Sequence, residues 1–318
     1  MSSLKPFRTL EEQADIILSR GCVGEKADII ERLRFVNYYR FSGYLYPYRQ
    51  EDPTSLKKLE KFVPGTNFND VWNTYRFDRR LRMLLLDAIE RIEVALRTRV
   101  AYLWSESTKN DSGACISNPQ DAFLIRQKSF YPEFLKSVQK NYDNSSADCA
   151  IHHKMNGFKN VKDLPIWVFV EFMTFGNFRP LIDDGLPVCV KNALAKSFGL
   201  KNSKKLSSIV SLIREIRNAC AHHSRVWNRS WSYKPKSSAV PMPIAPVIPD
   251  CPGIAFSSVS RNKTGYFLLL CDFLLRTIIP QSMWKSRLRV LCEEIKMDPV
   301  QMGFRSEEDF NAWVNVSL

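Results

Sequence analysis

One segment of the sequence contains five side chains, at helical spacing, that can bind a phosphate or transfer protons to it. Histidine can move protons near neutral pH, and arginine offers a permanent charge with a planar set of donors. Residues three or four apart share one face of an α-helix. We therefore predict that a helix over residues 203–228 aligns these side chains on its polar face: Arg214, Asn218, His222, Arg225 and Arg229.

This chemistry suits cleavage of RNA without a metal, because the RNA 2′-OH can itself attack the adjacent phosphate. The enzyme then supplies proton transfer and positive charge for the phosphorane. We expect His222 to act as acid and base, Arg217 to contact the phosphate, and Asn218 to hold a phosphate oxygen or orient the imidazole. The spacing of Arg217 and His222 also occurs by chance in many helices. His223 points about 100° away from His222 on a helix, so we predict that it either supports the catalytic residues or has a structural role.

The charge distribution supports an anionic partner. The chain has 318 residues and a net charge of +13, and residues 201–236 contain nine Lys and Arg against Glu215 alone. An excess of +8 in one segment predicts binding to nucleic acid or to an anionic membrane face, and we favour RNA. The RNA-binding candidates are Arg214, Arg225, Arg229, Lys201, Lys204 and Lys205.

Other classes of protein find little support. The longest apolar stretch, Tyr266 to Leu275, is too short to cross a bilayer, and the N-terminus lacks the apolar core of a signal peptide. We therefore expect a cytoplasmic protein without a membrane partner. The eight cysteines are scattered and the four histidines form two doublets, so we predict buried, reduced thiols, no metal site and no cofactor.

The rest of the sequence predicts an all-α fold. Thr9 and Glu12 form a capping box before a helix that Gly21 ends, and a second helix covers about 25–35. A long helix from Phe68 to about Trp104 follows a polar connector at 50–66. Loops are expected at 105–120 and 141–163. Further helices are expected at 121–140, from Pro165 to Gly176, and at 187–198, 203–228, 264–278 and 282–296. No convincing strand pattern is present.

We divide the chain into an N-terminal helical segment (1–50), a helical domain (68–296) with a proline-rich loop at 235–254, and a C-terminal tail (297–318). Within the long helix, Glu93 and Arg97 are spaced for a salt bridge. Glu171 lies in the otherwise apolar sequence WVFVEFMTF. We predict that it pairs with a buried arginine of residues 76–97; an alternative is that it orients Arg217 or His222.

The motif and its surroundings resemble known families. Arg217-Asn218-Ala219-Cys220-Ala221-His222 is similar to the Arg-x4-His motif of the HEPN superfamily. Its continuation, HSRVWNR at 223–229, resembles the abortive-infection Abi-D/F (Abi-like) family. Further blocks agree in the same order: NYYRFSGY at 37–44, YRFD at 75–78 with Leu81-Arg82, IERIE at 89–93, and LPIW at 164–167 through Glu171 to Phe175-Gly176. One departure is the tail, where Arg305 follows Gly303-Phe304 instead of the proline common in the family.

The resemblance implies an all-α HEPN-type helical bundle with an N-terminal helical extension. It also implies a role in phage defence and a metal-independent endoribonuclease whose site forms where two motifs meet in a homodimer. Some relatives are associated with a structured non-coding RNA, which we expect as a partner here.

Two rival hypotheses remain open. The first is an RNA-bound scaffold or sensor that forms a ribonucleoprotein. Its motif would bind a phosphate of the RNA without cleaving the RNA. The second is a DNA-binding regulator that uses the helix pair at 10–35 as a helix-turn-helix, although that pair has no clear basic recognition helix. RNA of one defined length copurifying with the protein would favour a ribonucleoprotein.

Overall fold

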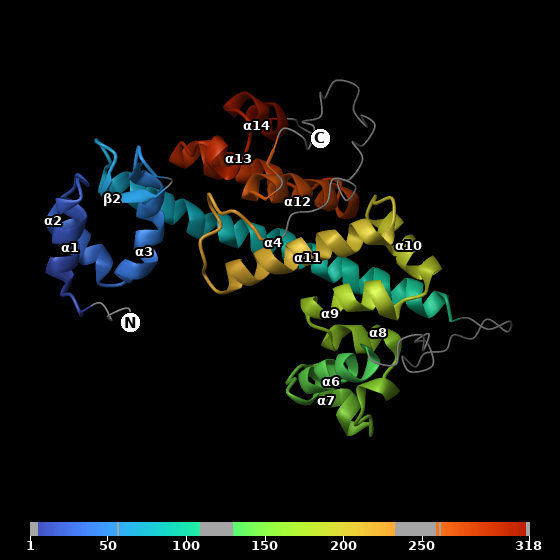
Figure 1. Cartoon of the computed structure of the whole chain (residues 1–318). Helices are drawn as coiled ribbons and strands as arrows, with labels where there is room; N and C mark the ends of the chain where they lie inside the picture. Colours follow the sequence, from blue (N-terminus) through green and yellow to red (C-terminus); the bar gives the residue numbers. More distant parts are fainter. Residues whose placement is uncertain (1–5, 56, 109–129, 233–258, 261, 316–318) are drawn as a thin grey trace. The chain divides into compact units, whose positions relative to one another are not determined.

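Helices make up most of the structure, as predicted (Figure 1). The computed structural model describes residues 6–55, 57–108, 130–232, 259–260 and 262–315. They divide into two compact units, Met1–Arg82 with Val290–Met297, and Met83–Arg289 with Asp298–Leu318. Two of the three boundaries between the units fall inside helices, namely α4 (Phe68–Glu106) and α13 (Trp284–Ile295), and the third follows α13 at Met297. The predicted proline-rich loop at 235–254 lies outside the described residues.

The first unit begins with three short helices, α1 (Leu10–Ser19), α2 (Lys26–Leu33) and α3 (Tyr38–Leu45). The predicted capping box of α1 is confirmed: the Glu12 amide donates to Thr9 Oγ1 at 3.2 Å, and the Thr9 amide donates to Glu12 Oε2 at 2.8 Å. Gly21 follows α1 with φ +94°, in the left-handed region that commonly ends helices.

A small hairpin occupies the segment that we predicted to be a polar connector. Strands β1 (Arg49–Glu51) and β2 (Lys58–Phe62) pair antiparallel after a 3-10 turn, η1 (Tyr46–Tyr48). Only Phe62 of the two strands is buried, so the sequence lacks the alternation of apolar and polar residues that predicts a strand. The prediction of no strand was therefore wrong at this hairpin.

A buried polar cluster stabilises the first unit. The Tyr44 hydroxyl donates to Asp78 Oδ2 at 2.5 Å, and Arg82 forms an ion pair with the same carboxylate. All three side chains are almost fully buried. A buried carboxylate is tolerated when it is paired and hydrogen-bonded, so Tyr44 has a structural role in this cluster.

The second unit contains the remaining helices in chain order. After the C-terminal part of α4 come α6 (Phe130–Asp143), α7 (Asp148–Met155), η2 (Val161–Asp163), α8 (Ile166–Phe169), η3 (Val170–Phe172), α9 (Phe175–Pro180), η4 (Leu181–Gly185), α10 (Val188–Ser197), α11 (Ser203–Ala221), α12 (Thr264–Ile278), the start of α13, η7 (Pro299–Met302) and α14 (Glu307–Val314). Helices α9 and α10 and the π-helical turn η4 all contact α11.

Two sequence predictions in this unit were wrong. The segment 141–163 contains α7, which has Asp148 in its first turn and Lys154 in its last, the arrangement that the helix dipole favours. Its single buried residue, Ala150, left no apolar pattern to detect. The helix predicted from Pro165 to Gly176 is instead interrupted at Met173, where the backbone is extended, and α9 begins anew after Thr174.

Residues 298–315 of the C-terminal tail belong to the second unit. Phe304, Phe310 and Trp313 form an aromatic cluster, with the rings of Phe304 and Trp313 stacked at 5.7 Å. The Trp313 indole donates to the buried carboxylate of Asp272 on α12 at 2.8 Å. Gly303 has φ +100°, so the turn before the cluster requires a residue without a Cβ.

Two further predictions concern the described residues only. Cys22, Cys220, Cys271 and Cys292 are buried, whereas Cys149 and Cys189 are exposed, so most of the thiols in this part of the chain are buried as predicted. Among the same residues, every helix is too short or too polar to span a bilayer.

Candidate functional site

Helix α11 carries the predicted motif, and its buried side forms as expected. Asn202 caps the helix by accepting a hydrogen bond from the Lys205 amide at 3.2 Å. One side of α11 is an apolar stripe that is buried along its whole length: Leu206, Ile209, Ile213, Ile216 and Cys220. The opposite side of the helix is therefore left to the polar residues.

The helix ends earlier than predicted, at Ala221. His223 has φ +56°, in the left-handed region. Its amide bonds to the Cys220 carbonyl at 3.1 Å, and the Ser224 amide bonds to the Ala219 carbonyl at 2.8 Å. These two bonds form a Schellman motif, which closes a helix and turns the chain away from its axis. The predicted helix over 203–228 is thus wrong beyond 221.

The early end of α11 changes the predicted line of cations. Arg225 and Arg229 follow the helix and do not continue its polar face. Arg229 Nη1 donates to the Arg225 carbonyl at 3.5 Å, and its guanidinium lies 4.6 Å from the ring centre of Trp231. Trp227 is buried, and it also lies beyond the end of the helix.

The shortened face still holds the proposed catalytic residues. Arg214, Asn218 and His222 are spaced by four residues and are exposed, so they follow one another along one side of α11. His222 is the C-cap, with its amide bonded to the Asn218 carbonyl at 2.9 Å. No hydrogen bond joins its ring to the part of the chain that the structure describes. His223 lies at the turn itself, where its backbone closes the helix.

A cavity of about 560 Å³ lies between α9 and α11. One wall consists of Thr174, Phe175, Gly176 and Arg179. The other consists of five residues of α11: Ser211, Arg214, Glu215, Arg217 and Asn218. Two of the three predicted catalytic residues, Arg217 and Asn218, therefore line this cavity, while His222 lies one turn beyond Asn218.

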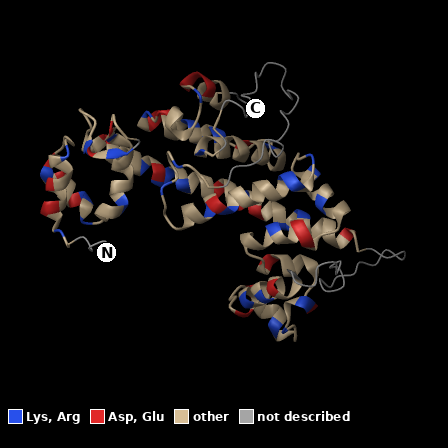
Figure 2. Cartoon of the chain, viewed as in Figure 1, with Lys and Arg blue, Asp and Glu red and all other residues tan. Residues whose placement is uncertain are grey.

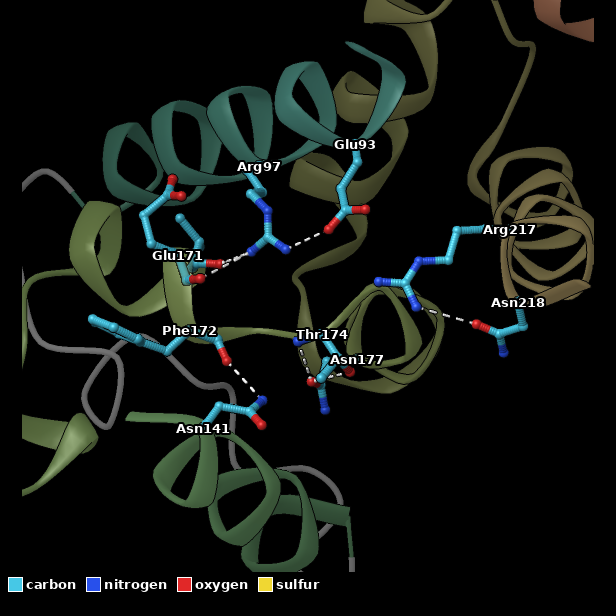
Figure 3. A network of polar contacts seen from close by, with 10 residues as sticks. Glu93, Arg97, Asn141, Glu171, Phe172, Thr174, Asn177, Arg217 and Asn218 are labelled. Carbon is cyan, nitrogen blue, oxygen red and sulfur yellow. Dashed lines mark hydrogen bonds and ion pairs between the residues drawn. The ribbon is translucent and has the colours of Figure 1, made fainter. Parts of the chain in front are cut away.

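Arg217 and Asn218 are in contact. Arg217 Nη1 donates to Asn218 Oδ1 at 3.3 Å, and Figure 3 shows the Arg217 side chain extending from α11 toward the helix that carries Asn177. Arg217 is half-buried and Asn218 is exposed. The amide thus orients the guanidinium without neutralising its charge.

The wall opposite α11 is fixed by a reciprocal cap. The Thr174 backbone amide donates to Asn177 Oδ1 at 2.7 Å (Figure 3). The side-chain nitrogen of Asn177, Nδ2, donates to Ser137 Oγ of α6 at 3.2 Å. Asn177 is buried. Asn141, also on α6, donates to the Phe172 carbonyl at 2.9 Å. Helix α6 therefore holds the start of α9 in place.

Helix α4 holds the same connection from another side. The predicted salt bridge is confirmed, with Arg97 Nη2 at 2.5 Å from Glu93 Oε1. Arg97 Nη1 donates to the carbonyls of Val170 at 2.5 Å and Glu171 at 3.3 Å (Figure 3). The predicted pairing of the Glu171 carboxylate was wrong, because that side chain is exposed and its backbone carbonyl contacts the arginine instead.

The predicted lysines differ in accessibility. Lys201 and Lys204 are exposed, and the segment where α10 leads into α11 is basic in Figure 2. Lys205 has a relative exposure of only 8%, so it does not offer its charge to an RNA in this structure. Within the described ranges, no three His, Cys, Asp or Glu side chains cluster in a way that could hold a metal ion.

The sequence predicted functional residues on one wall of the cavity but none on the other. Arg217, Asn218, His222 and Arg214 all lie at or next to it. Arg179 was missed because α9 was expected to have ended before it. The available signal was Thr174 followed three residues later by Asn177, which has the spacing of a capping box with asparagine in place of Glu or Gln.

Comparison with known proteins gives one match. A family model described as Abi-like protein matches residues 31–228. The match covers more than half of the chain, including all of α11 and the residues that line the cavity. No curated protein and no solved structure matches the chain.

Proposed function

This chain belongs to the family of Abi-like proteins, and from that premise we propose that it is a HEPN-type endoribonuclease that cleaves RNA without a metal. Membership in the family indicates a role in abortive infection, a defence against phage. The proposal adds RNA as the substrate and a dimer as the active form. It also adds a structured non-coding RNA as a binding partner.

The observation that carries the proposal is the arrangement of the motif at the end of α11. Arg217 and Asn218 line a cavity, and His222 is exposed one turn further along the same face as Asn218. An imidazole and a guanidinium that both reach solvent beside a cavity can act on a bound phosphodiester. A histidine packed into the core could not do so.

The reaction needs only groups that the protein and the RNA supply. The 2′-oxygen attacks the adjacent phosphorus, forming a new P–O bond, and the bond from phosphorus to the 5′-oxygen breaks. A base takes the 2′-OH proton, and an acid gives a proton to the departing 5′-oxygen. His222 provides proton transfer, and Arg217 stabilises the negative charge that builds up on the phosphorane oxygens.

A second copy of the chain completes the site in this proposal. Each chain carries one Arg-x4-His motif, and one imidazole cannot take one proton and give another at the same moment. Two motifs related by a two-fold axis would supply two imidazoles and two guanidiniums. His222 is exposed at the end of α11, so a partner can approach it.

The test of the chemistry is cleavage of RNA in the presence of EDTA. The products should end in a 2′,3′-cyclic phosphate, and a substrate with deoxyribose at the scissile position should stay intact. His222→Ala and Arg217→Ala should each lower the cleavage rate by about 10²–10³-fold. Arg305→Ala removes an exposed arginine away from the cavity and serves as the matched control.

Three outcomes would contradict the proposal. Dependence on Mg²⁺ or full activity of His222→Ala would show that the motif does not perform the chemistry. The RNA-bound scaffold would then account better for a basic segment, and sequencing the RNA that copurifies would identify the partner. A protein that sediments as a monomer with and without RNA would exclude the two-motif site.

A further inference from the structure

The cavity between α9 and α11 carries more positive charge than the proposed chemistry uses. Three arginines and one glutamate line it, for a net charge of +2. Arg217 belongs to the motif, but Arg214 lies one turn before Asn218 and Arg179 comes from the opposite wall. Arginines gathered from two helices around one hollow are typical of a site for phosphate oxygens.

The charges of the cavity are only partly neutralised by carboxylates of the protein. Arg214 is exposed and forms no hydrogen bond or ion pair within the described part of the chain. The Arg179 guanidinium lies 3.4 Å from Asp183, with both side chains about half exposed. Glu215 accepts a hydrogen bond from the Ser232 amide at 3.1 Å, which orients its carboxylate toward the chain that follows α11.

The cavity also has room for part of a nucleotide. Its volume of about 560 Å³ falls in the range of small-molecule sites. Gly176 keeps the wall open opposite Arg214: a Cβ there would lie 3.9 Å from Arg214 Cδ and 3.4 Å from Thr174 Oγ1. Any longer side chain at this position would therefore extend along Arg214 and occupy the space.

We propose that this cavity binds the phosphodiester of a nucleotide next to the scissile one, with Arg214 as its principal ligand and Arg179 as the second. The identity of the anion as RNA rests on the proposed function. The cavity then fixes the register of the RNA chain, because Arg214 holds one phosphate while Arg217 contacts the next. It is a positioning subsite and supplies no proton to the reaction.

The test measures binding in a chain that cannot cleave. All variants carry His222→Ala, and a labelled 12-nucleotide single-stranded RNA is titrated by fluorescence anisotropy across a range of salt concentrations. Loss of one phosphate contact lowers the slope of log K against log salt by about 0.7 for a single strand. We expect this decrease for Arg214→Ala and no change for the control Arg305→Ala.

A second variant tests the space independently of the charge. Gly176→Leu keeps all arginines but fills the cavity, and it should weaken RNA binding as Arg214→Ala does. Circular dichroism checks that both variants fold. If Gly176→Leu does not fold, Gly176→Ala is tested in its place, because the added Cβ makes only ordinary contacts. Arg179→Ala is tested beside it and should also lower the slope of log K against log salt.

The source of the phosphate is resolved by competition. Inorganic phosphate and a nucleoside 3′-monophosphate are titrated against the same RNA complex and, separately, against free protein by thermal shift. Displacement only at concentrations far above that of the RNA assigns the cavity to a polynucleotide. If RNA does not bind but the mononucleotide stabilises the His222→Ala chain and not the chain that also carries Arg214→Ala, the phosphate site is supported and its ligand is a free nucleotide.

Failure of the subsite and failure of the ribonuclease give different results. If Arg214→Ala and Gly176→Leu bind RNA and nucleotide with the slope and affinity of Arg305→Ala, the subsite is refuted, whatever the cleavage assay shows. If neither RNA nor nucleotide binds to the wild-type chain, it is refuted as well. If the wild-type protein binds RNA through Arg214 but does not cleave it, the subsite is supported and the proposed ribonuclease activity is refuted.

Discussion

His223 determines where α11 ends, and its backbone conformation makes a quantitative prediction. Its φ of +56° places an L-residue in the left-handed region, which costs roughly 1–2 kcal/mol compared with glycine. Replacing a residue by glycine also raises the entropy of the unfolded chain, which offsets about 0.4–1 kcal/mol of that gain. We therefore expect His223→Gly to be about 0.5–1 kcal/mol more stable than His223→Ala.

The comparison between glycine and alanine is chosen because both variants lack the imidazole. Any contact that the ring makes is lost equally from both, so the difference reports the backbone alone. Urea unfolding followed by circular dichroism gives the free energy of unfolding by linear extrapolation. In thermal unfolding, the same difference should appear as a shift of about 0.7–1.5 °C for a chain of 318 residues.

The result also bears on the site. Because His223 acts through the backbone in this account, both variants should keep the wild-type cleavage rate within a few-fold, in contrast to His222→Ala. Equal stability of His223→Gly and His223→Ala would refute the left-handed turn as the end of α11. Loss of cleavage in His223→Gly would instead give the second imidazole a part in the reaction.

Three further predictions concern other parts of the chain. Trp313→Phe keeps the ring stack but removes a hydrogen bond to the buried carboxylate of Asp272, and should lower the free energy of unfolding by about 1.5–3 kcal/mol in urea titrations. Gly303→Ala should cost at least about 2 kcal/mol in the same assay, because the new Cβ would lie 2.3 Å from Lys263 Cβ at a φ of +100°. Burial raises the pKa of Cys22 to about 11, so at pH 8 iodoacetamide should alkylate it over a hundredfold more slowly in the folded protein than in urea, as mass spectrometry of its peptide can measure. Since this pKa is raised by folding, the contribution of Cys22 to stability should be complete below about pH 8.5 and decline as the pH rises toward 11.

The sequence predicted the elements whose apolar residues follow a clear period. The long helix α4 and the buried stripe of α11 both repeat apolar residues every three or four positions over many turns. The start of α1 was predicted because Thr9 and Glu12 form a local motif whose hydrogen bonds need no tertiary contact. Such features depend only on residues that are close together in the chain, so a single sequence is enough to predict them.

The elements that the sequence did not predict depend on contacts from elsewhere or on single backbone angles. The end of α11 is set by a left-handed histidine where glycine would have been the usual signal. The break before α9 is stabilised by Arg97 and by Asn141, which are distant in the chain. The hairpin has one buried residue, Phe62. In each case the local sequence is compatible with a different structure, and tertiary contacts decide.

The same distinction explains which part of the candidate site could be predicted. Arg217, Asn218 and His222 are close in sequence and share one helix, so spacing alone brought them together. The opposite wall exists because Arg97 binds the carbonyls of the chain between α8 and α9 and thereby fixes where α9 begins. Removing that clamp should therefore change the cavity without touching any residue that lines it. The family match from 31 to 228 contains the clamp, both walls of the cavity and the turn at His223, so every residue that builds this cavity lies within the segment that matches the family.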